Sequence, residues 1–219
     1  MKETYWTPET IDAKARQMLN AVRSNAPRAK AFMPDLSHAA LLVLDMQRYF
    51  LSADSHAFIP SAPAIVQNLQ RMVSFFQAHD RPVVLTRHLN DPADAGMMSA
   101  WWGDLIRDTQ PLSQIIPELQ QSTAVVIEKA QYDAFYETGL ARHLTAHHVK
   151  QVVITGVMTH LCCETTARSA FVQGFHVFFP VDGTATYNEL FHRSSLVNLC
   201  HGFATPLLID DVIETLGMP

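Results

Sequence analysis

The sequence predicts an α/β fold, a three-layer α/β/α sandwich around a mostly parallel, Rossmann-like sheet of six strands. Three observations lead to this prediction. Short apolar segments alternate with helical patterns, which is the order of βαβ units with right-handed crossovers. Most strand candidates are apolar throughout, as expected of strands buried on both faces. The 219 residues, 48% hydrophobic and 17% charged, suffice for one such domain with a substantial core.

The first predicted element is an N-terminal helix. Thr7 and Pro8 are favoured residue types for an N-cap and a first helical position, and the helix would run to about Ser24. Its apolar positions suit packing on the main domain or on a partner subunit. We therefore interpret residues 1–37 as an N-terminal helical extension and residues 38–219 as the main domain.

The main domain then alternates between strands and helices. Strands are predicted at residues 40–44, 82–86, 124–127, 152–155, 177–180 and 206–209. Helices are predicted at residues 62–79, 139–147, 162–174 and 189–201. In sheets of this kind ligands bind beyond the carboxyl ends of the strands. Residues that carry chemistry should therefore come directly after strands.

Composition and charge exclude several classes of partner. A net charge of −5 gives no electrostatic reason to expect nucleic acid or an anionic membrane. No apolar stretch approaches the roughly 20 residues that span a bilayer, and the first ten residues lack the apolar segment of a signal peptide. The three cysteines show no zinc-ribbon spacing. A cytoplasmic protein with free thiols and no cofactor is the simplest interpretation.

Polar side chains stand at the ends of three predicted strands. Asp45 closes the first strand, Lys129 closes the third, and Cys162 follows the fourth in a strand-to-helix connection. If these strands are neighbours, the three side chains converge on one pocket. A carboxylate can take the thiol proton, and an ammonium can keep that carboxylate ionised and favour the thiolate. Backbone N–H groups at the start of the helix can bind an oxyanion.

Three segments resemble the signature regions of the isochorismatase-like hydrolases: residues 41–47, 129–135 and 156–166. They occur in the right order and spacing, and the resemblance covers roughly residues 38–215. This superfamily includes nicotinamidases, N-carbamoylsarcosine amidases, other small-amide hydrolases and true isochorismatases.

The resemblance implies a role for each residue of the predicted site. Asp45 would be the general acid and base, Lys129 its charged partner and Cys162 the nucleophile. A cis peptide bond between Val157 and Met158 is also implied. It would turn the backbone N–H groups of Met158 and Cys162 towards one oxyanion site.

Members of the superfamily catalyse two types of reaction, and the sequence has features of both. Amidase members attack a carbonyl with the cysteine, release an amine and hydrolyse the thioester. Many isochorismatases have glycine at that position; their aspartate protonates a vinyl ether, water adds, and pyruvate leaves. Cys162 favours the amidases, whereas the surrounding run Thr-His-Leu-Cys-Cys-Glu-Thr-Thr-Ala is closer to the isochorismatases. We favour hydrolysis of a small amide, with isochorismate cleavage as the alternative.

One further observation bears on the choice between these two reactions. The loop arginine that binds substrate carboxylates in isochorismatases is missing near Ala95, although Arg87 or His88 could replace it. A third hypothesis, a catalytically idle oligomeric scaffold, is disfavoured because all three triad positions are intact.

Several residues near these segments are candidates for contact with a small-molecule substrate. They are Gln47, Phe50, His88, Trp101, Trp102, Tyr132, Phe135 and His160, and packing explains some of them equally well. Nicotinamidase-type members bind a metal after the second strand. Here His88 and Asp91 are only two potential ligands, too few for a closed zinc site, so we predict no metal. We expect a homo-oligomer, either a dimer or a tetramer.

Overall fold

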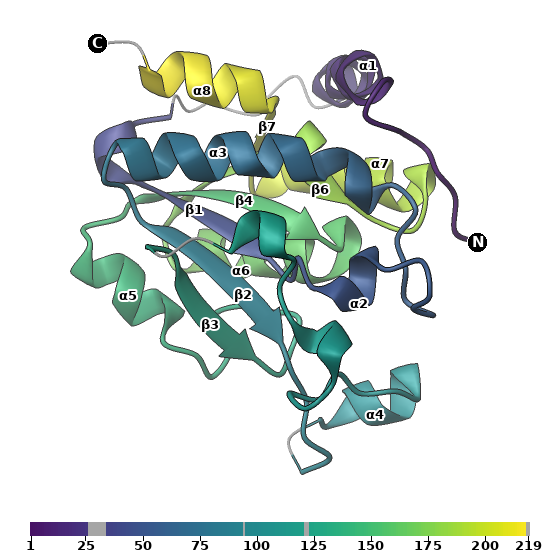
Figure 1. The fold of residues 1–219 in the computed structure, drawn as a ribbon. Coiled ribbons are helices and arrows are strands. Elements are labelled where there is room, and N and C mark those ends of the chain that lie inside the picture. Colours follow the sequence, from purple (N-terminus) through teal and green to yellow (C-terminus); the bar gives the residue numbers. More distant parts are fainter. Residues whose placement is uncertain (26–33, 94, 121–122, 218–219) are drawn as a thin grey trace.

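The computed structural model of the chain describes residues 1–25, 34–93, 95–120 and 123–217. A parallel sheet forms its centre, with helices on both faces (Figure 1). The strands are β1 (Ala39–Leu44), β2 (Val83–His88), β3 (Val125–Lys129), β4 (Gln151–Val157), β5 (His176–Pro180), β6 (Thr184–Ala185) and β7 (Thr205–Leu207). Their order is β3-β2-β1-β4-β5-β7, and the two-residue β6 pairs with β4. The predicted α/β fold is confirmed, with β6 as an additional strand too short to leave a pattern.

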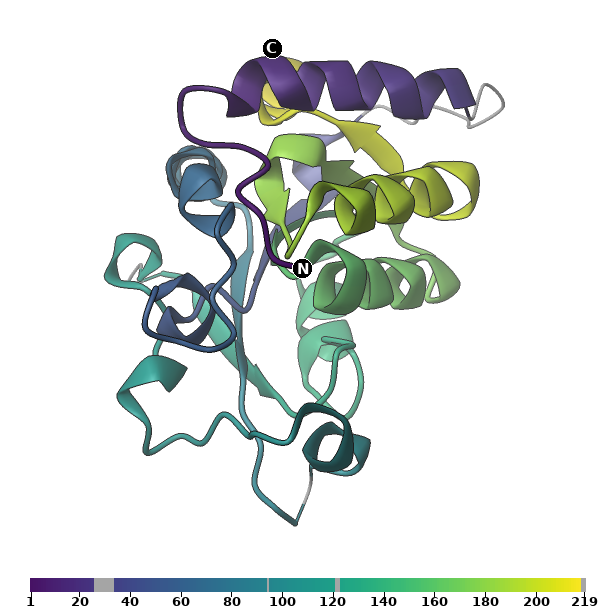
Figure 2. The same ribbon diagram turned by 90° about the vertical axis from the view of Figure 1, so that its right-hand side faces the viewer.

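The helices are α1 (Ile11–Asn25), α2 (Arg48–Leu51), α3 (Val66–Ala78), α4 (Met97–Trp102), α5 (Leu140–Ala146), α6 (Glu164–Val172), α7 (Glu189–Gly202) and α8 (Ile209–Gly217). The longer helices cover the two faces of the sheet, whereas the short helices α2 and α4 lie beyond the ends of its strands (Figure 1). Figure 2 shows α6 and α7 on the face of the sheet opposite α3. Within the ranges described, no helix has the length and apolar character needed to cross a bilayer.

The predicted end of the last strand is wrong. The last predicted strand, residues 206–209, overlaps the start of α8, because β7 ends at Leu207. Asp211 starts the helix by accepting a hydrogen bond from the backbone N–H of Leu208 at 3.0 Å. Its negative charge in the first turn also stabilises the helix dipole.

The sheet is buried unevenly. Every residue of β1 is buried, as expected of a central strand covered on both faces. In contrast, β3 is an edge strand, and Val125 and Val126 are 40% and 49% exposed. The prediction of burial on both faces is therefore wrong for β3.

The N-terminal extension packs on the main domain itself. Tyr5 and Trp6 are buried, and α1 buries Ile11, Met18 and Leu19 in the same hydrophobic core as the sheet. Residues 26–33 of the predicted extension lie outside the described residues. The described part of the extension shares the core of the sheet rather than forming a core of its own.

The strand register places the predicted chemistry at one edge of the sheet. Leu44, the last residue of β1, pairs with Gly156 of β4, so Asp45 emerges beside the end of β4. Lys129 ends β3 and pairs with His88, the last residue of β2. The carboxyl ends of β1, β2, β3 and β4 thus converge, as expected for a ligand site in an open parallel sheet.

Candidate active site

The structure brings Asp45, Lys129 and Cys162 into direct contact. The Nζ of Lys129 lies 2.7 Å from Oδ2 of Asp45 and 3.4 Å from Sγ of Cys162. All three residues are buried. The three strand-end residues therefore form one cluster, with the ammonium between the carboxylate and the sulfur.

Neighbouring groups hold the carboxylate and the ammonium in place. The hydroxyl of Thr86 donates to Oδ1 of Asp45 at 2.6 Å and accepts from the backbone N–H of Asp45 at 3.0 Å. The ammonium of Lys129 also donates to the carbonyl of Gln131 at 2.9 Å. These bonds leave little rotational freedom, so the site is preorganised before any substrate enters.

Electrostatics define the resting proton positions. Burial by itself would raise the pKa of Asp45, but the charge of Lys129 holds it below its ordinary value. Burial would lower the pKa of Lys129, whereas Asp45 and Cys162 raise it above its ordinary value. Burial and the charge of Asp45 raise the pKa of Cys162 to about 12. The resting cluster is therefore a carboxylate, an ammonium and a neutral thiol.

This resting state differs from the expectation that Lys129 favours a thiolate. Desolvation and the Asp45 charge outweigh the attraction of the ammonium for a negative sulfur. Any reaction at the sulfur of Cys162 would therefore require removal of the thiol proton. The ionised carboxylate of Asp45, which pairs with the same ammonium as the sulfur, is a proton acceptor within the cluster.

Cys162 lies in a π-helical turn, Thr159–Cys163, that precedes α6. The sequence predicted an α-helix that starts at residue 162. The structure instead has a π-helical turn there, and the α-helix starts at Glu164. The backbone N–H groups of Leu161 and Cys163 both donate to the carbonyl of Met158, at 3.1 and 3.2 Å. The peptide bond between Val157 and Met158 is cis. Short π-helical segments are frequently found at functional sites.

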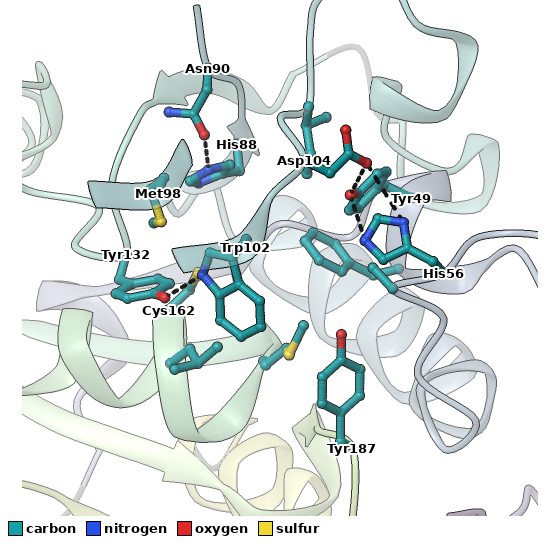
Figure 3. Close-up of a pocket in the computed structure, with 15 residues that line it drawn as sticks. Tyr49, His56, His88, Asn90, Met98, Trp102, Asp104, Tyr132, Cys162 and Tyr187 are labelled. Atoms are coloured by element: carbon teal, nitrogen blue, oxygen red, sulfur yellow. Dashed lines mark hydrogen bonds and ion pairs between the residues drawn. The ribbon is translucent and has the colours of Figure 1, made fainter. Parts of the chain in front are cut away.

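Cys162 and Met158 open into a cavity of about 170 Å³ (Figure 3). Its other lining residues are Tyr49, Phe50, His56, Ala57, His88, Asn90, Met98, Trp102, Asp104, Ile106, Tyr132, Leu161 and Tyr187. Aromatic and apolar side chains dominate this wall. An engineered apolar cavity of about 150 Å³ in another protein binds benzene. The cavity therefore suits a substrate built on one six-membered ring.

Four of the eight predicted substrate-binding residues line this cavity: Phe50, His88, Trp102 and Tyr132. The indole N–H of Trp102 donates to the hydroxyl of Tyr132 at 2.7 Å, which joins α4 to the segment after β3. The neighbouring Trp101 does not line the cavity and is 75% exposed. Of these two predicted contact residues, only Trp102 therefore lines the cavity, and Trp101 lies outside it.

The predicted residue Gln47 is also away from the cavity. Its amide nitrogen donates to the carbonyls of His88 and Ser113, and its amide oxygen accepts from the N–H of His88. The side chain thus clamps the end of β2 to a loop. All of this bonding capacity is directed to the backbone rather than to a ligand.

Phe135 and His160 have packing roles instead of lining the cavity. Phe135 stacks on Phe175, with ring centroids 5.9 Å apart. His160 stacks on Phe191 at 4.5 Å, and its Nδ1 lies 2.6 Å from the hydroxyl oxygen of Thr186. Neither residue is among those that line the cavity.

Sequence reasoning missed several polar lining residues: Tyr49, His56, Asn90, Asp104 and Tyr187. The hydroxyl of Tyr49 donates to Asp104 at 2.9 Å and lies 3.2 Å from Nε2 of His56. Asn90 comes two residues after the end of β2, so its position after a strand could have identified it as a candidate site residue. Tyr49 lies in the four-residue helix α2, which is too short for a periodic pattern, and His56, Asp104 and Tyr187 lie in loops, where no pattern predicts the direction of a side chain.

The residues after β2 do not fit a metal site. The ammonium of Lys129 lies 3.3 Å from Nδ1 of His88, and because it only donates, Nδ1 must accept. Nε2 then donates to Oδ1 of Asn90 at 2.8 Å. Both ring nitrogens are occupied, and an ammonium stands where a divalent cation would need negative charge. Within the described part of the chain, no three histidine, cysteine or acidic side chains cluster as metal ligands.

Arg87 points away from the cavity. Its guanidinium forms ion pairs with Asp108 and Glu128, at 2.5 and 3.2 Å. It also donates to the hydroxyl of Ser113 at 2.7 Å. Arg87 therefore does not occupy the place of the missing loop arginine.

We predict that Thr86→Val shifts the pH profile of activity. Valine has nearly the same shape but removes the hydrogen bond to the ionised Asp45, so the pKa of Asp45 should rise. We expect kcat at neutral pH to fall about tenfold and the acid limb of the kcat profile to move to higher pH. Thr155→Val is the matched control, because the Thr155 hydroxyl bonds to the carbonyl of Leu42 instead. An unchanged acid limb in Thr86→Val would contradict the role of this bond.

The fold and the cluster of carboxylate, ammonium and thiol define the class of the protein, an α/β cysteine hydrolase. A family model described as Isochorismatase domain matches residues 39–211. The chain belongs to this isochorismatase family. The predictions of the superfamily and of a hydrolase are confirmed.

Comparison with individual proteins gives relatives of both chemistries. Nicotinamidase 3 of Arabidopsis thaliana is 43% identical over 176 residues, which cover 78% of this chain and 85% of that protein. Isochorismatase of Bacillus subtilis is 27% identical over 197 residues, which cover 88% of this chain and 63% of that protein. A cysteine hydrolase from Pseudomonas syringae has a similar structure, with a TM-score of 0.82 and 24% identity. That alignment covers 85% of this chain and 96% of the other.

Proposed function

We propose that this protein hydrolyses a small carboxamide on a single ring, of the nicotinamide class, through a thioester on Cys162. One observation carries the proposal: the sulfur lies at the wall of a ring-sized cavity, in contact with the Lys129–Asp45 ion pair. The 43% identity to a nicotinamidase supports the same class of substrate. The predicted class, a small-amide hydrolase, is confirmed. That the amide is attached to a ring is our proposal.

In the first half of the reaction, Sγ of Cys162 attacks the amide carbon while Asp45 takes the thiol proton. The negative charge that develops on the amide oxygen is bound by the backbone N–H groups of Met158 and Cys162. The intermediate then collapses. Its C–N bond breaks as Asp45 returns the proton to the nitrogen, so ammonia leaves and a thioester remains.

Water completes the cycle. Asp45 takes a proton from the water as its oxygen attacks the thioester carbon. Collapse of the second intermediate breaks the C–S bond, the carboxylic acid leaves, and Asp45 returns the proton to the sulfur. Lys129 stays charged throughout and stabilises the negative charge that moves between Asp45 and Cys162.

The charge of the cavity disfavours isochorismate, a dianion. No arginine or lysine is among the lining residues of the described chain, and Asp104 contributes a carboxylate. Arg87 is committed to ion pairs elsewhere. A dianion would thus enter an apolar cavity without a cation to offset its desolvation.

The substitution Cys162→Ala tests the proposal. We expect it to abolish release of ammonia from nicotinamide, because the thioester can no longer form. Activity on isochorismate, measured as pyruvate release, should be absent or marginal in both the unchanged protein and the variant. If isochorismate cleavage is efficient, survives Cys162→Ala and is lost in Asp45→Asn, the amide proposal is wrong and the vinyl-ether chemistry is correct.

We also propose a cytoplasmic location and a homo-oligomer, a dimer or tetramer. The location is supported by three cysteines that are all free and buried. The oligomer is supported by the edge strand β3, where Val125 and Val126 are exposed. An uncovered apolar edge of this kind is a common site for pairing between subunits.

A further inference from the structure

We propose that the N-terminal segment, residues 1–6, belongs to the substrate site: it fixes Tyr187, whose hydroxyl donates a hydrogen bond to an acceptor atom on the substrate ring. This inference rests on the proposed amide function and adds a specificity residue to it. The substrate class becomes carboxamides whose ring has an acceptor, such as a pyridine nitrogen.

Tyr187 differs from the other two tyrosines of the cavity. The hydroxyl of Tyr49 donates to Asp104, and the hydroxyl of Tyr132 accepts from Trp102. The Tyr187 hydroxyl has no hydrogen-bond partner among the residues that the structure describes, and it points into the cavity (Figure 3). Burial raises the pKa of Tyr187 above its ordinary value, so the hydroxyl keeps its proton. It is therefore a donor without an acceptor.

The N-terminal segment holds Tyr187 from two sides. The ammonium of Lys2 lies 4.6 Å from the centre of the Tyr187 ring, within range of a cation–π interaction. The N–H of Glu3 donates to the carbonyl of Tyr187 at 2.8 Å, and the Glu3 carboxylate accepts from the N–H of Glu189 at 2.6 Å. The hydroxyl of Tyr5 accepts from the N–H of Thr186 at 3.1 Å.

The same segment also binds the opposite loop of the cavity. The ammonium of Lys2 donates to the carbonyl of His56, and the N–H of Tyr5 donates to the hydroxyl of Ser61 at 3.0 Å. Figure 2 shows the segment running from α1 to the start of α7. Residues 1–6 thus connect the loop that contains His56 to the loop that contains Tyr187. Both of these residues line the cavity.

The chemistry of the remaining wall indicates what Tyr187 would bind. The substrate amide belongs at Cys162, so the other side of a bound ring faces the rest of the cavity. That wall is largely apolar, and a ring nitrogen left there without a donor would lose its hydrogen bond to water. A hydroxyl that is free to donate compensates for this loss. It would favour a pyridine ring over a benzene ring of the same size.

The test compares nicotinamide with benzamide, which has C–H in place of the ring nitrogen. We expect Tyr187→Phe to lower kcat/KM for nicotinamide about tenfold, mainly through KM, and to leave benzamide within twofold. Lys2→Met should raise KM for nicotinamide about threefold without changing kcat. Tyr136→Phe and Lys150→Met are the controls, because both residues are exposed and outside the cavity. Equal effects of Tyr187→Phe on both amides, or no effect, would overturn the proposal.

A binding measurement separates this inference from the proposed reaction. In the Cys162→Ala background, calorimetry should give a lower Kd for nicotinamide than for benzamide, and Tyr187→Phe should remove the difference. If neither amide is hydrolysed but this preference is found, the reaction proposal fails and the Tyr187 site stands. If both amides are hydrolysed but bind equally, the Tyr187 site is wrong and the reaction proposal stands.

Discussion

Replacing Asp45 by asparagine is expected to slow turnover strongly and, at the same time, to lower the pKa of Cys162. The buried charge of Asp45 contributes to raising that pKa to about 12, and Lys129 acts in the opposite direction. Asparagine removes the first effect and leaves the ammonium 3.4 Å from the sulfur. The thiolate becomes easier to form, yet no base remains to take the proton or return it to the leaving group. We expect kcat to fall by about 10²–10⁴-fold.

The two effects can be measured separately. Steady-state release of ammonia gives kcat. The pH dependence of alkylation at Cys162 by iodoacetamide, followed by peptide mass spectrometry, gives the midpoint for the thiol. Cys200 serves as an internal control, because Asp45 is not among the groups that shift its pKa. A rise in the Cys162 midpoint, or turnover close to that of the unchanged protein, would refute the assignment of Asp45 as the base.

The fold and the three residues of the buried cluster could be predicted because each depends on local sequence pattern. Apolar runs identified the strands, and Asp45, Lys129 and Cys162 were found because each closes or follows one. The contact among them then follows from parallel pairing, since the carboxyl ends of neighbouring strands meet at one edge.

The cavity wall was harder to predict because it is built by contacts between distant segments. Tyr187 gains its position from Lys2 and Glu3, which are more than 180 residues away in sequence. Trp101 and Trp102 are adjacent in α4, so only one of them faces the cavity, and the sequence does not indicate which. Gln47 is polar and near Asp45, but its partners are backbone groups that no side-chain pattern reveals.

Replacing Gly156 by alanine is expected to have the largest effect on stability. Gly156 has a φ of +103°, and an added Cβ would lie 2.1 Å from the carbonyl oxygen and 2.6 Å from the backbone nitrogen of Leu44. These atoms belong to β1, the buried central strand, and cannot move away without breaking its pairing with β4. We expect a loss of more than about 4 kcal/mol in the free energy of unfolding, or no soluble protein. Chemical denaturation and soluble yield are the measurements.

Alanine substitutions at two other glycines distinguish the effect of the steric clash from the effect of the strained backbone conformation. Gly174 also has a positive φ, +89°, but an added Cβ would meet no atom within 4 Å, so alanine there should cost roughly 1–2 kcal/mol. Gly202, at the end of α7, has open space as well, and alanine there should be nearly neutral. A loss at Gly156 no larger than the loss at Gly174 would show that β1 and β4 do not approach as closely as described. Because Asp45 follows Leu44 directly, any Gly156→Ala protein that does fold should also have a displaced carboxylate and a reduced kcat.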